Sequence, residues 1–258
     1  MGGPVVPTTI PAADIIAWWP GEDGTPEGLE DIINAQDASS ATGMTKATGY
    51  VGNHYLFDAT ANGGDGVSAV ISTSTFFDRI FTSKELTIEG WIDFDSLPSV
   101  VTGQHFGIMS RGTWNYGDGT LAIGTESQFT LYVGDTGTSR RLYFYLNRGG
   151  STYGINFVMS ASSGVHHVAA VLQYNGSQHR VILYFDLVAE ASTSYVPEAL
   201  VSSSGGILIG NMEHTDTSFA GFTGALDEMT IYDKALTPAQ IAAIVAQGSA
   251  GKTGIVTF

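Results

Sequence analysis

The sequence contains no cysteine, which excludes disulfides, zinc–thiolate sites and cysteine nucleophiles. Basic residues are scarce as well, because 10 Lys and Arg stand against 25 Asp and Glu, a net charge of −15. A field of this sign repels nucleic acid and anionic membrane surfaces, so we expect neither as a partner. Calcium suits such a chain because it prefers oxygen ligands. Simple solubility explains the acidity equally well.

Long apolar runs are also missing, and none approaches the roughly 20 residues of a membrane span. The segment from Met1 to Ala13 has no basic start and no apolar stretch, so it does not resemble a signal peptide. Its three prolines predict an extended arm over residues 1–13, either loose or docked on a neighbour. Eight prolines against 33 glycines favour tight turns over proline-rich linkers.

Short apolar runs alternate with glycine-rich turns along most of the chain, which predicts strands. In Leu86–Phe94 and in Arg141–Asn147, apolar side chains alternate with polar or aromatic ones. Asn175-Gly176 predicts a hairpin turn. The other expected strands are Ile15–Trp19, His167–Tyr174, Arg180–Asp186, Ile207–Gly210 and Ala225–Tyr232.

A single helix is predicted after Thr237, which forms a capping box with Gln240, and Gly248 ends it. Many strands and one short helix indicate a β-sandwich. No repeat or change in composition divides the chain, so we expect one domain over residues 14–251 and a short tail over 252–258.

Several segments, in order, resemble laminin G-like jelly-roll domains of the concanavalin A-like lectin and glucanase superfamily. They are DIIAWWPGEDG at Asp14–Gly24, HYLFD at His54–Asp58, LTIEGW at Leu86–Trp91, VHHVAAV at Val165–Val171, Ile207–Gly210, and FTGALDEMTIYDKAL at Phe222–Leu236. The resemblance implies an all-β jelly-roll sandwich of two antiparallel sheets with one short C-terminal helix. Val165 stands where the family usually has tryptophan. Tyr184–Ala191 lacks the family's glycine, which predicts a different turn there.

The paired glutamates of hydrolases in this superfamily, in an E-x-D-x-x-E run, are missing from the sequence. The nearest group is Glu89, Asp93 and Asp95 on one strand face, with Pro98 where the second acid belongs. No nucleophile elbow, phosphate loop or dinucleotide fingerprint occurs either. We therefore expect no catalysis.

Two groups of residues are candidates for metal sites. Adjacent strand residues point to opposite faces, so His166 and His167 are expected to be structural and not to share an ion. The resemblance implies a structural Ca²⁺ where the end of the first strand meets the last strand, held by Glu22 and Asp227. Asp58, with Asp65, brackets a loop that would form a second site. The alternative is that Asp227 only accepts a backbone amide.

Aromatic and polar side chains gather in two segments that suit sugar binding. Tyr143 and Tyr145 share a strand face with Arg141, and Trp114 and Tyr116 lie in a polar loop. Outward-facing tyrosines without a ligand are the competing interpretation. Trp91 is expected in the core.

Two functions follow from these features. The first is a non-catalytic structural protein of a virion surface, such as a phage decoration or fibre component. The alternative is a calcium-supported carbohydrate-binding module of a secreted protein, and a glycanase is excluded by the missing glutamates. Partners would be glycans, a viral or cell-surface lattice, or further copies through the arm or tail. The other expectation is that the tail adds a strand to the sheet of its own chain. The location would be a virion surface or extracellular.

Overall fold

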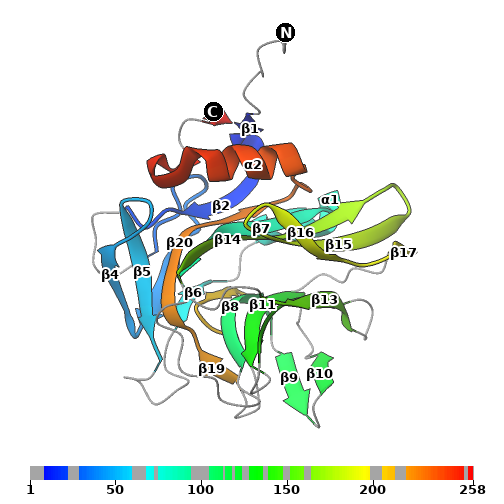
Figure 1. The fold of residues 1–258 in the computed structure, drawn as a ribbon, viewed down its shortest axis with the longest axis horizontal. Coiled ribbons are helices and arrows are strands. Elements are labelled where there is room, and N and C mark those ends of the chain that lie inside the picture. The colour runs from blue at the N-terminus through cyan, green and yellow to red at the C-terminus, as the bar shows by residue number, and fades with distance from the viewer. Residues whose placement is uncertain are drawn as a thin grey trace.

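Two large β-sheets stack face to face and make up most of the molecule (Figure 1). This computed structural model describes residues 9–22, 29–59, 68–72, 75–93, 105–112, 114–117, 120–123, 128–135, 139–147, 152–159, 164–197, 205–212, 219–252 and 255–257. Within them, one sheet has nine strands in the order β16-β15-β14-β7-β20-β5-β4, with β2 beside β20 and β17 beside β15. The other has eight, in the order β13-β12-β11-β8-β18-β6-β3, with β19 beside β8.

The strands of both sheets are short and almost all antiparallel; β19 runs parallel to β8. The nine-stranded sheet contains β2 (Ile15–Trp19), β4 (Met44–Thr48), β5 (Asn53–Asp58), β7 (Leu86–Asp93), β14 (Val165–Tyr174), β15 (Gln178–Phe185), β16 (Val188–Ser192), β17 (Val196–Pro197) and β20 (Thr223–Tyr232). The eight-stranded sheet contains β3 (Ala38–Thr42), β6 (Ser68–Ile71), β8 (His105–Arg111), β11 (Phe129–Asp135), β12 (Arg140–Asn147), β13 (Thr152–Val158), β18 (Ile207–Ile209) and β19 (Phe219–Gly221).

Smaller elements complete the fold. The strands β1 (Ile10–Pro11) and β21 (Val256–Thr257) pair in parallel, and β9 (Trp114–Gly117) pairs with β10 (Thr120–Ile123) as a hairpin. The helices are α1 (Arg79–Ser83) and α2 (Pro238–Gln247). Short 3-10 turns span Ala12–Asp14, Thr75–Asp78 and Gly248–Ala250.

The nine-stranded sheet is buried on both of its faces. Successive strand residues point to opposite faces, and β2 shows the result: Trp19 enters the core between the sheets, whereas its neighbour Trp18 enters a second core on the outer face. Both tryptophans are almost completely buried. The run Ile15–Trp19 is apolar throughout for this reason, because neither face of the strand meets water.

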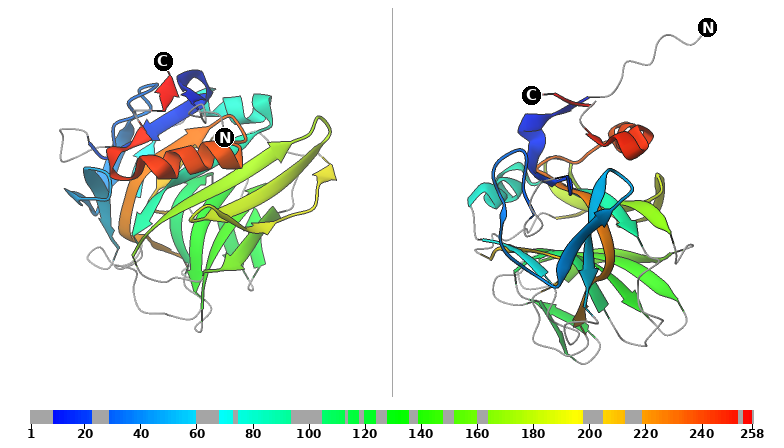
Figure 2. Two further views of the ribbon diagram at one scale, coloured as in Figure 1. Left: turned by 45° about the horizontal axis from the view of Figure 1, so that its top comes forward. Right: turned by 90° about the vertical axis from the view of Figure 1, so that its left-hand side faces the viewer.

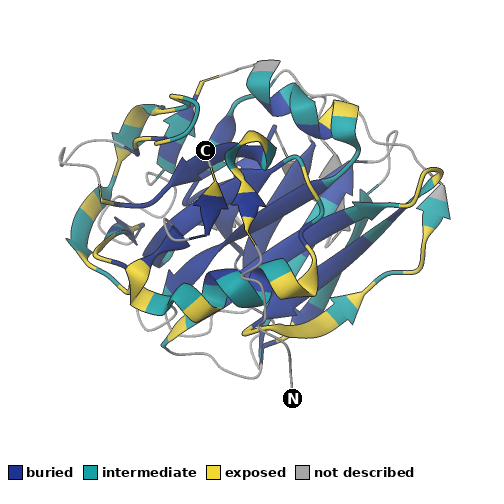
Figure 3. Cartoon of the chain, turned by 90° about the horizontal axis from the view of Figure 1, so that it is seen from above, coloured by how far each residue is buried: buried dark blue, intermediate teal, exposed yellow. Residues whose placement is uncertain are grey.

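Helix α2 and the two paired termini form the cover over that outer face (Figures 1 and 2). Ile241 and Ile244 of α2 pack in the second core with Ile10, which precedes the helix by more than two hundred residues, and with Val256. Figure 3 shows buried strands beneath a helix whose upper side is partly exposed. The tail pairs with β1 in a two-stranded sheet of its own, so it contacts the same chain but adds no strand to either large sheet.

The predicted jelly-roll sandwich is confirmed, and the predicted strands appear with small shifts at their ends. Thr237 caps α2 through the expected capping box with Gln240. Phe94, expected at the end of β7, lies outside the described residues. The prediction of a single helix was incomplete, because the five-residue helix α1 was missed. It is too short to show a helical period.

The turn between β15 and β16 lies where the sequence lacks the family's glycine. Phe185 pairs directly with Val188, so only Asp186 and Leu187 form the turn. Both have positive φ angles, 46° and 72°, as a two-residue type I′ hairpin requires. Leu187 thus adopts a conformation that glycine would adopt more easily.

Candidate functional site

Three aromatic residues gather on the outer face of the eight-stranded sheet. In β12, Leu142, Phe144 and Leu146 enter the core between the sheets, so the alternating residues point outward. Those are Arg141, Tyr143 and Tyr145, the three strand residues predicted to bind a ligand. Tyr132 of β11 lies directly across from Tyr143 and joins them. We call Tyr132, Arg141, Tyr143 and Tyr145, with His105 of β8 and Asn156 of β13, the tyrosine face.

The rings of the tyrosine face are nearly parallel. The ring centroids of Tyr132 and Tyr143 lie 4.6 Å apart with only 2° between their planes. Tyr145 lies 6.1 Å from Tyr143 at 24°. Glycines on the neighbouring strands make room for them: a side chain at Gly134 would meet the Tyr143 ring, and one at Gly154 would meet Tyr145.

Part of this face is covered and part is open. Tyr132 is 1% exposed and His105 is 5% exposed, whereas Arg141, Tyr143 and Tyr145 stay partly exposed. The backbone of Asn211 and Met212 runs over Gly107, where any side chain would clash. The open part of the tyrosine face therefore lies over β12, beside this covering segment.

Arg141 is held in one position on the open part. Its Nη1 donates to Oδ1 of Asn156, 2.8 Å away on the adjacent strand. Tyr132 and Asn156 were not predicted from the sequence. The alternation in Phe129–Asp135 could have indicated Tyr132, whereas pairing of Asn156 with β12 has no local signal.

Trp114 and Tyr116, the other two predicted ligand residues, are in β9. The β9–β10 hairpin lies beyond the eight-stranded sheet, on the side opposite α2, in both views (Figures 1 and 2), and β10 contacts β13. The strand itself thus lies on the same side of the molecule as the tyrosine face. The placement of the two side chains lies outside what the structure describes.

The outer face of the nine-stranded sheet carries a buried charge network instead. Glu89 is fully buried, and its carboxylate accepts from Nζ of Lys252 at 2.9 Å and from the hydroxyl of Tyr232 at 2.8 Å. Nε2 of His167 lies 2.9 Å away. Burial alone would raise the pKa of Glu89, but Lys252 and His167 lower it to about 2.

This network contains residues from two groups singled out in the sequence, the carboxylates around Glu89 and the pair His166 and His167. Glu89 lies buried beneath α2, where a substrate cannot reach it. Asp93 ends the same strand, and Asp95 lies outside the described residues. His167 faces Glu89, whereas His166 contacts Asp186 at 2.6 Å. The two histidines therefore have different partners, as their adjacent positions on a strand predict. Trp91 is 6% exposed, beside Tyr50 and His167, as expected for the core.

A bulge in β20 brings further carboxylates to the surface end of the network. The register of β20 shifts between Asp227 and Thr230, and Glu228 has a positive φ of 57°. Glu228 accepts from Nε1 of Trp18 at 2.9 Å and lies 3.3 Å from Nζ of Lys252. Burial raises its pKa. A strained, acidic segment thus lies next to the buried network.

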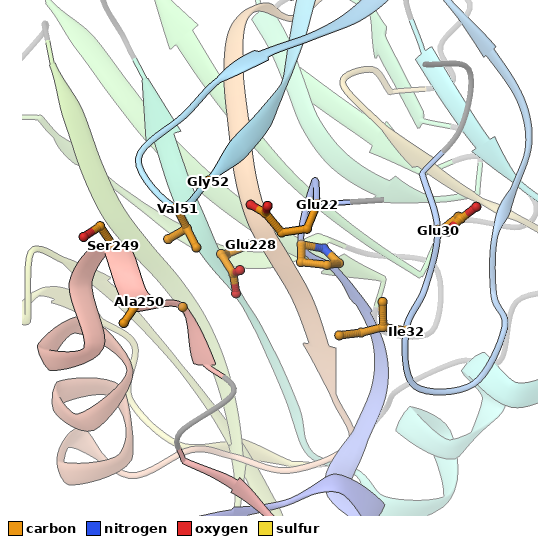
Figure 4. A pocket seen from close by; sticks show the side chains of 10 residues that line it. Glu22, Glu30, Ile32, Val51, Gly52, Glu228, Ser249 and Ala250 are labelled. Atoms are coloured by element: carbon orange, nitrogen blue, oxygen red, sulfur yellow. The ribbon is translucent and has the colours of Figure 1, made fainter. Parts of the chain in front are cut away.

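A cavity of about 470 Å³ opens beside this bulge (Figure 4). Figure 4 shows Glu22, Val51 and Glu228 around it, with Ser249 and Ala250 on one side and Glu30 on the far side of a loop. Pro20, Ile32, Gly52 and Gly251 complete its lining.

The predicted calcium ligands meet only in part. Oδ2 of Asp227 accepts the amide of Val51 at 2.8 Å, and Oε1 of Glu22 accepts the amide of Asn53 at the same turn. Oδ1 of Asp227 is buried without a partner, and burial raises its pKa to about 7. Asp58 lies at the opposite end of β5, and Asp65 lies outside the described residues. No three carboxylate or histidine side chains among the described residues gather to hold a metal ion.

The fold and the sequence together define the family. The model of the concanavalin A-like lectin/glucanases superfamily matches residues 61–242. The chain belongs to this superfamily, in its laminin G-like branch. A search among curated proteins found no match. None of the helices in the described ranges is long and apolar enough to cross a membrane.

Solved structures share the fold at low sequence identity. Domain 4 of an extracellular arabinanase from Geobacillus stearothermophilus, in complex with arabinotriose, is 16% identical with a TM-score of 0.55, over 88% of this chain and 96% of that one. The sialidase CBM40 of Ruminococcus gnavus is 14% identical with a TM-score of 0.53, over 70% and 93%. A botulinum neurotoxin D/C binding domain is 13% identical with a TM-score of 0.63, over 91% of this chain and 52% of that one.

Proposed function

We propose that this chain is a non-catalytic carbohydrate-binding domain and that its ligand lies against the tyrosine face. The observation that carries the proposal is the row of near-parallel rings on β11 and β12, partly exposed on a sheet face that α2 does not cover. Tyrosine rings present an apolar face to a sugar ring and a hydroxyl to its edges. Arg141 adds fixed donors at one end of the row.

The similar structures support this proposal without establishing it. They include an arabinanase domain in complex with arabinotriose and a sialidase CBM40, which share the fold only. The inaccessibility of Glu89 supports a non-catalytic role. An extracellular location belongs to the proposal, because the arabinanase is an extracellular protein.

The test is a glycan panel probed with the purified chain and with three single variants, Tyr143→Ala, Tyr145→Ala and Trp114→Ala. We expect one glycan to bind the wild type and each of the three variants to bind it at least tenfold more weakly, the effect of losing a contact at the centre of an interface. Tyr195→Ala, which removes a 39% exposed tyrosine, is the matched control and should bind normally. If no glycan binds, the proposal is wrong.

The virion role takes second place. It needs a surface that docks on a lattice neighbour, and the tail expected to supply it pairs with β1 of the same chain. A panel without any bound glycan would make particle assembly, or self-association through another surface, the function to pursue. Light scattering of the purified chain would then detect larger assemblies.

A structural Ca²⁺ remains a separate proposal, limited to the turn that Asp227 and Glu22 share. Oδ1 of Asp227 is buried without a partner, so it suits a hard cation. The positive charge of the ion would compensate the buried negative charge of this carboxylate. We expect Ca²⁺ to raise the melting temperature of the wild type and not of Asp227→Asn, with Mg²⁺ as the control ion. Equal melting curves with Ca²⁺ and with EDTA would exclude this site.

A further inference from the structure

Arg141 has no acidic partner among the described residues, and neither has Arg180, which lies over the ring of Tyr195 instead. Arg79 pairs with Asp233 at 2.7 Å, and Arg111 pairs with Asp78 at 2.9 Å. Arg141 donates to the neutral amide oxygen of Asn156, and no carboxylate of the described residues forms an ion pair with it. In a chain with 25 acidic and 10 basic residues, an arginine without a carboxylate requires an explanation.

The surroundings of Arg141 keep its remaining donors available. A guanidinium group has five N–H donors in a planar fork, and the structure uses one of them on Asn156. The residue directly across on β11 is Gly134, which has no side chain to cover the guanidinium. Tyr143 follows two residues later on the same face, and Arg141 is partly exposed.

We propose that the ligand of the tyrosine face is an acidic sugar whose carboxylate binds Arg141. This inference rests on the proposed function and names the class of its ligand. A carboxylate matches the guanidinium fork with two parallel hydrogen bonds, a geometry that a neutral hydroxyl does not offer. The sugar ring then lies beside Tyr143 and Tyr145, where an aromatic face packs against its C–H groups.

The charge of the whole chain limits the ligand further. A net charge of −15 repels a polyanion along its whole length, whereas a single carboxylate needs only the local attraction of Arg141. The expected ligand is therefore an oligosaccharide that carries one acidic sugar, of the uronic acid or sialic acid type, at its end. A polyuronate or a sulfated polymer should bind more weakly.

Two matched pairs of probes test this by calorimetry: sialyllactose against lactose, and methyl glucuronide against methyl glucoside. We expect one acidic probe to bind the wild type at least tenfold more tightly than its neutral partner. The pair that shows the difference identifies which acidic sugar is recognised. Arg141→Gln should bind both members of that pair with the lower, neutral affinity.

Further variants separate the explanations. Arg141→Lys keeps the positive charge without the planar guanidinium group, so it should retain only part of the preference for the acidic sugar. Arg180→Gln, which removes a cation stacked on Tyr195, should leave the preference unchanged. Equal binding of acidic and neutral probes to the wild type would overturn the acidic ligand and leave carbohydrate binding intact. Loss of both probes in Arg141→Gln would overturn it too, because Arg141 would then contact the neutral sugar.

Discussion

The outer faces of the two sheets differ in how their polar side chains are satisfied. On the nine-stranded sheet, α2 and the paired termini cover the face, and Glu89, Lys252 and Tyr232 bind one another beneath this cover. On the eight-stranded sheet, neither of the helices in the described residues covers the corresponding strands (Figure 1). There Arg141 and its neighbouring tyrosines stay partly exposed, and the arginine has donors left over.

The difference indicates which face is structural and which is available to a ligand. A buried charge is tolerated only when partners within the protein satisfy it, so a completed network implies a role in folding. A polar group with unused donors at an aromatic surface gains partners only from water or a ligand. The predictions below test this contrast through stability, where the covered face should be sensitive and the open face tolerant.

The largest effect is expected from Lys252→Met. This change leaves Glu89 and Glu228 buried without their cation, which costs about 3–5 kcal/mol of unfolding free energy. Urea unfolding measures it. Lys234→Met is the matched control, because Lys234 is 53% exposed and its contact with Glu85 contributes at most about 1 kcal/mol. Similar losses in both variants would contradict a structural network.

The pH dependence of the same network comes next. The pKa of Glu89 is lowered to about 2 in the folded protein, so its contribution is complete above its ordinary value of 4.5 and disappears as the pH falls through 2. The stability gap between the wild type and Glu89→Gln should therefore narrow by about 2 kcal/mol between pH 6 and pH 3. Urea unfolding at several pH values measures this gap. A constant gap would show that Glu89 titrates normally.

The two adjacent tryptophans of β2 provide a smaller and closely matched test. Nε1 of Trp18 donates to the carboxylate of Glu228, whereas Nε1 of Trp19 donates to the carbonyl of Gln36 at 3.0 Å. A hydrogen bond to a charged group contributes more, so Trp18→Phe should cost about 1 kcal/mol more than Trp19→Phe. Thermal unfolding of the two variants compares them directly. A larger loss in Trp19→Phe would mean that packing in the main core outweighs the network.

Much of this architecture could be predicted because its signals are local. The capping box at Thr237 and the Asn175-Gly176 turn involve residues a few positions apart, and the alternation in β12 placed Arg141, Tyr143 and Tyr145 on one face. The burial of the outer face of the nine-stranded sheet had no such local signal in the sequence. Leu86–Asp93 alternates, yet both of its faces are buried, because the second cover comes from residues at the far ends of the chain.

The partners of the buried charged residues could not be predicted from the sequence either. Lys252 follows Glu89 by 163 residues, and nothing near either one indicates the pairing. For Asp227 the sequence left a calcium ligand and a partner of a backbone amide as alternatives, and the structure provides the amide of Val51. Long-range pairing is set by the order of strands in the sheets, which composition and spacing do not reveal.

The smallest effect is expected on the open face. Arg141 is partly exposed, and among the described residues its side chain is hydrogen-bonded to Asn156 alone, so Arg141→Gln should change the unfolding free energy by no more than about 0.5 kcal/mol. Arg111, 1% exposed and bonded to Asp78 and Gln128, is the contrasting arginine of the same sheet, and Arg111→Gln should cost well over 2 kcal/mol. Urea unfolding of both variants decides between the two roles. A loss in Arg141→Gln as large as that in Arg111→Gln would make Arg141 a structural residue, because its remaining donors would then have partners within the fold. A stable Arg141→Gln variant that also loses the preference for acidic sugars would place binding, and not folding, on this face.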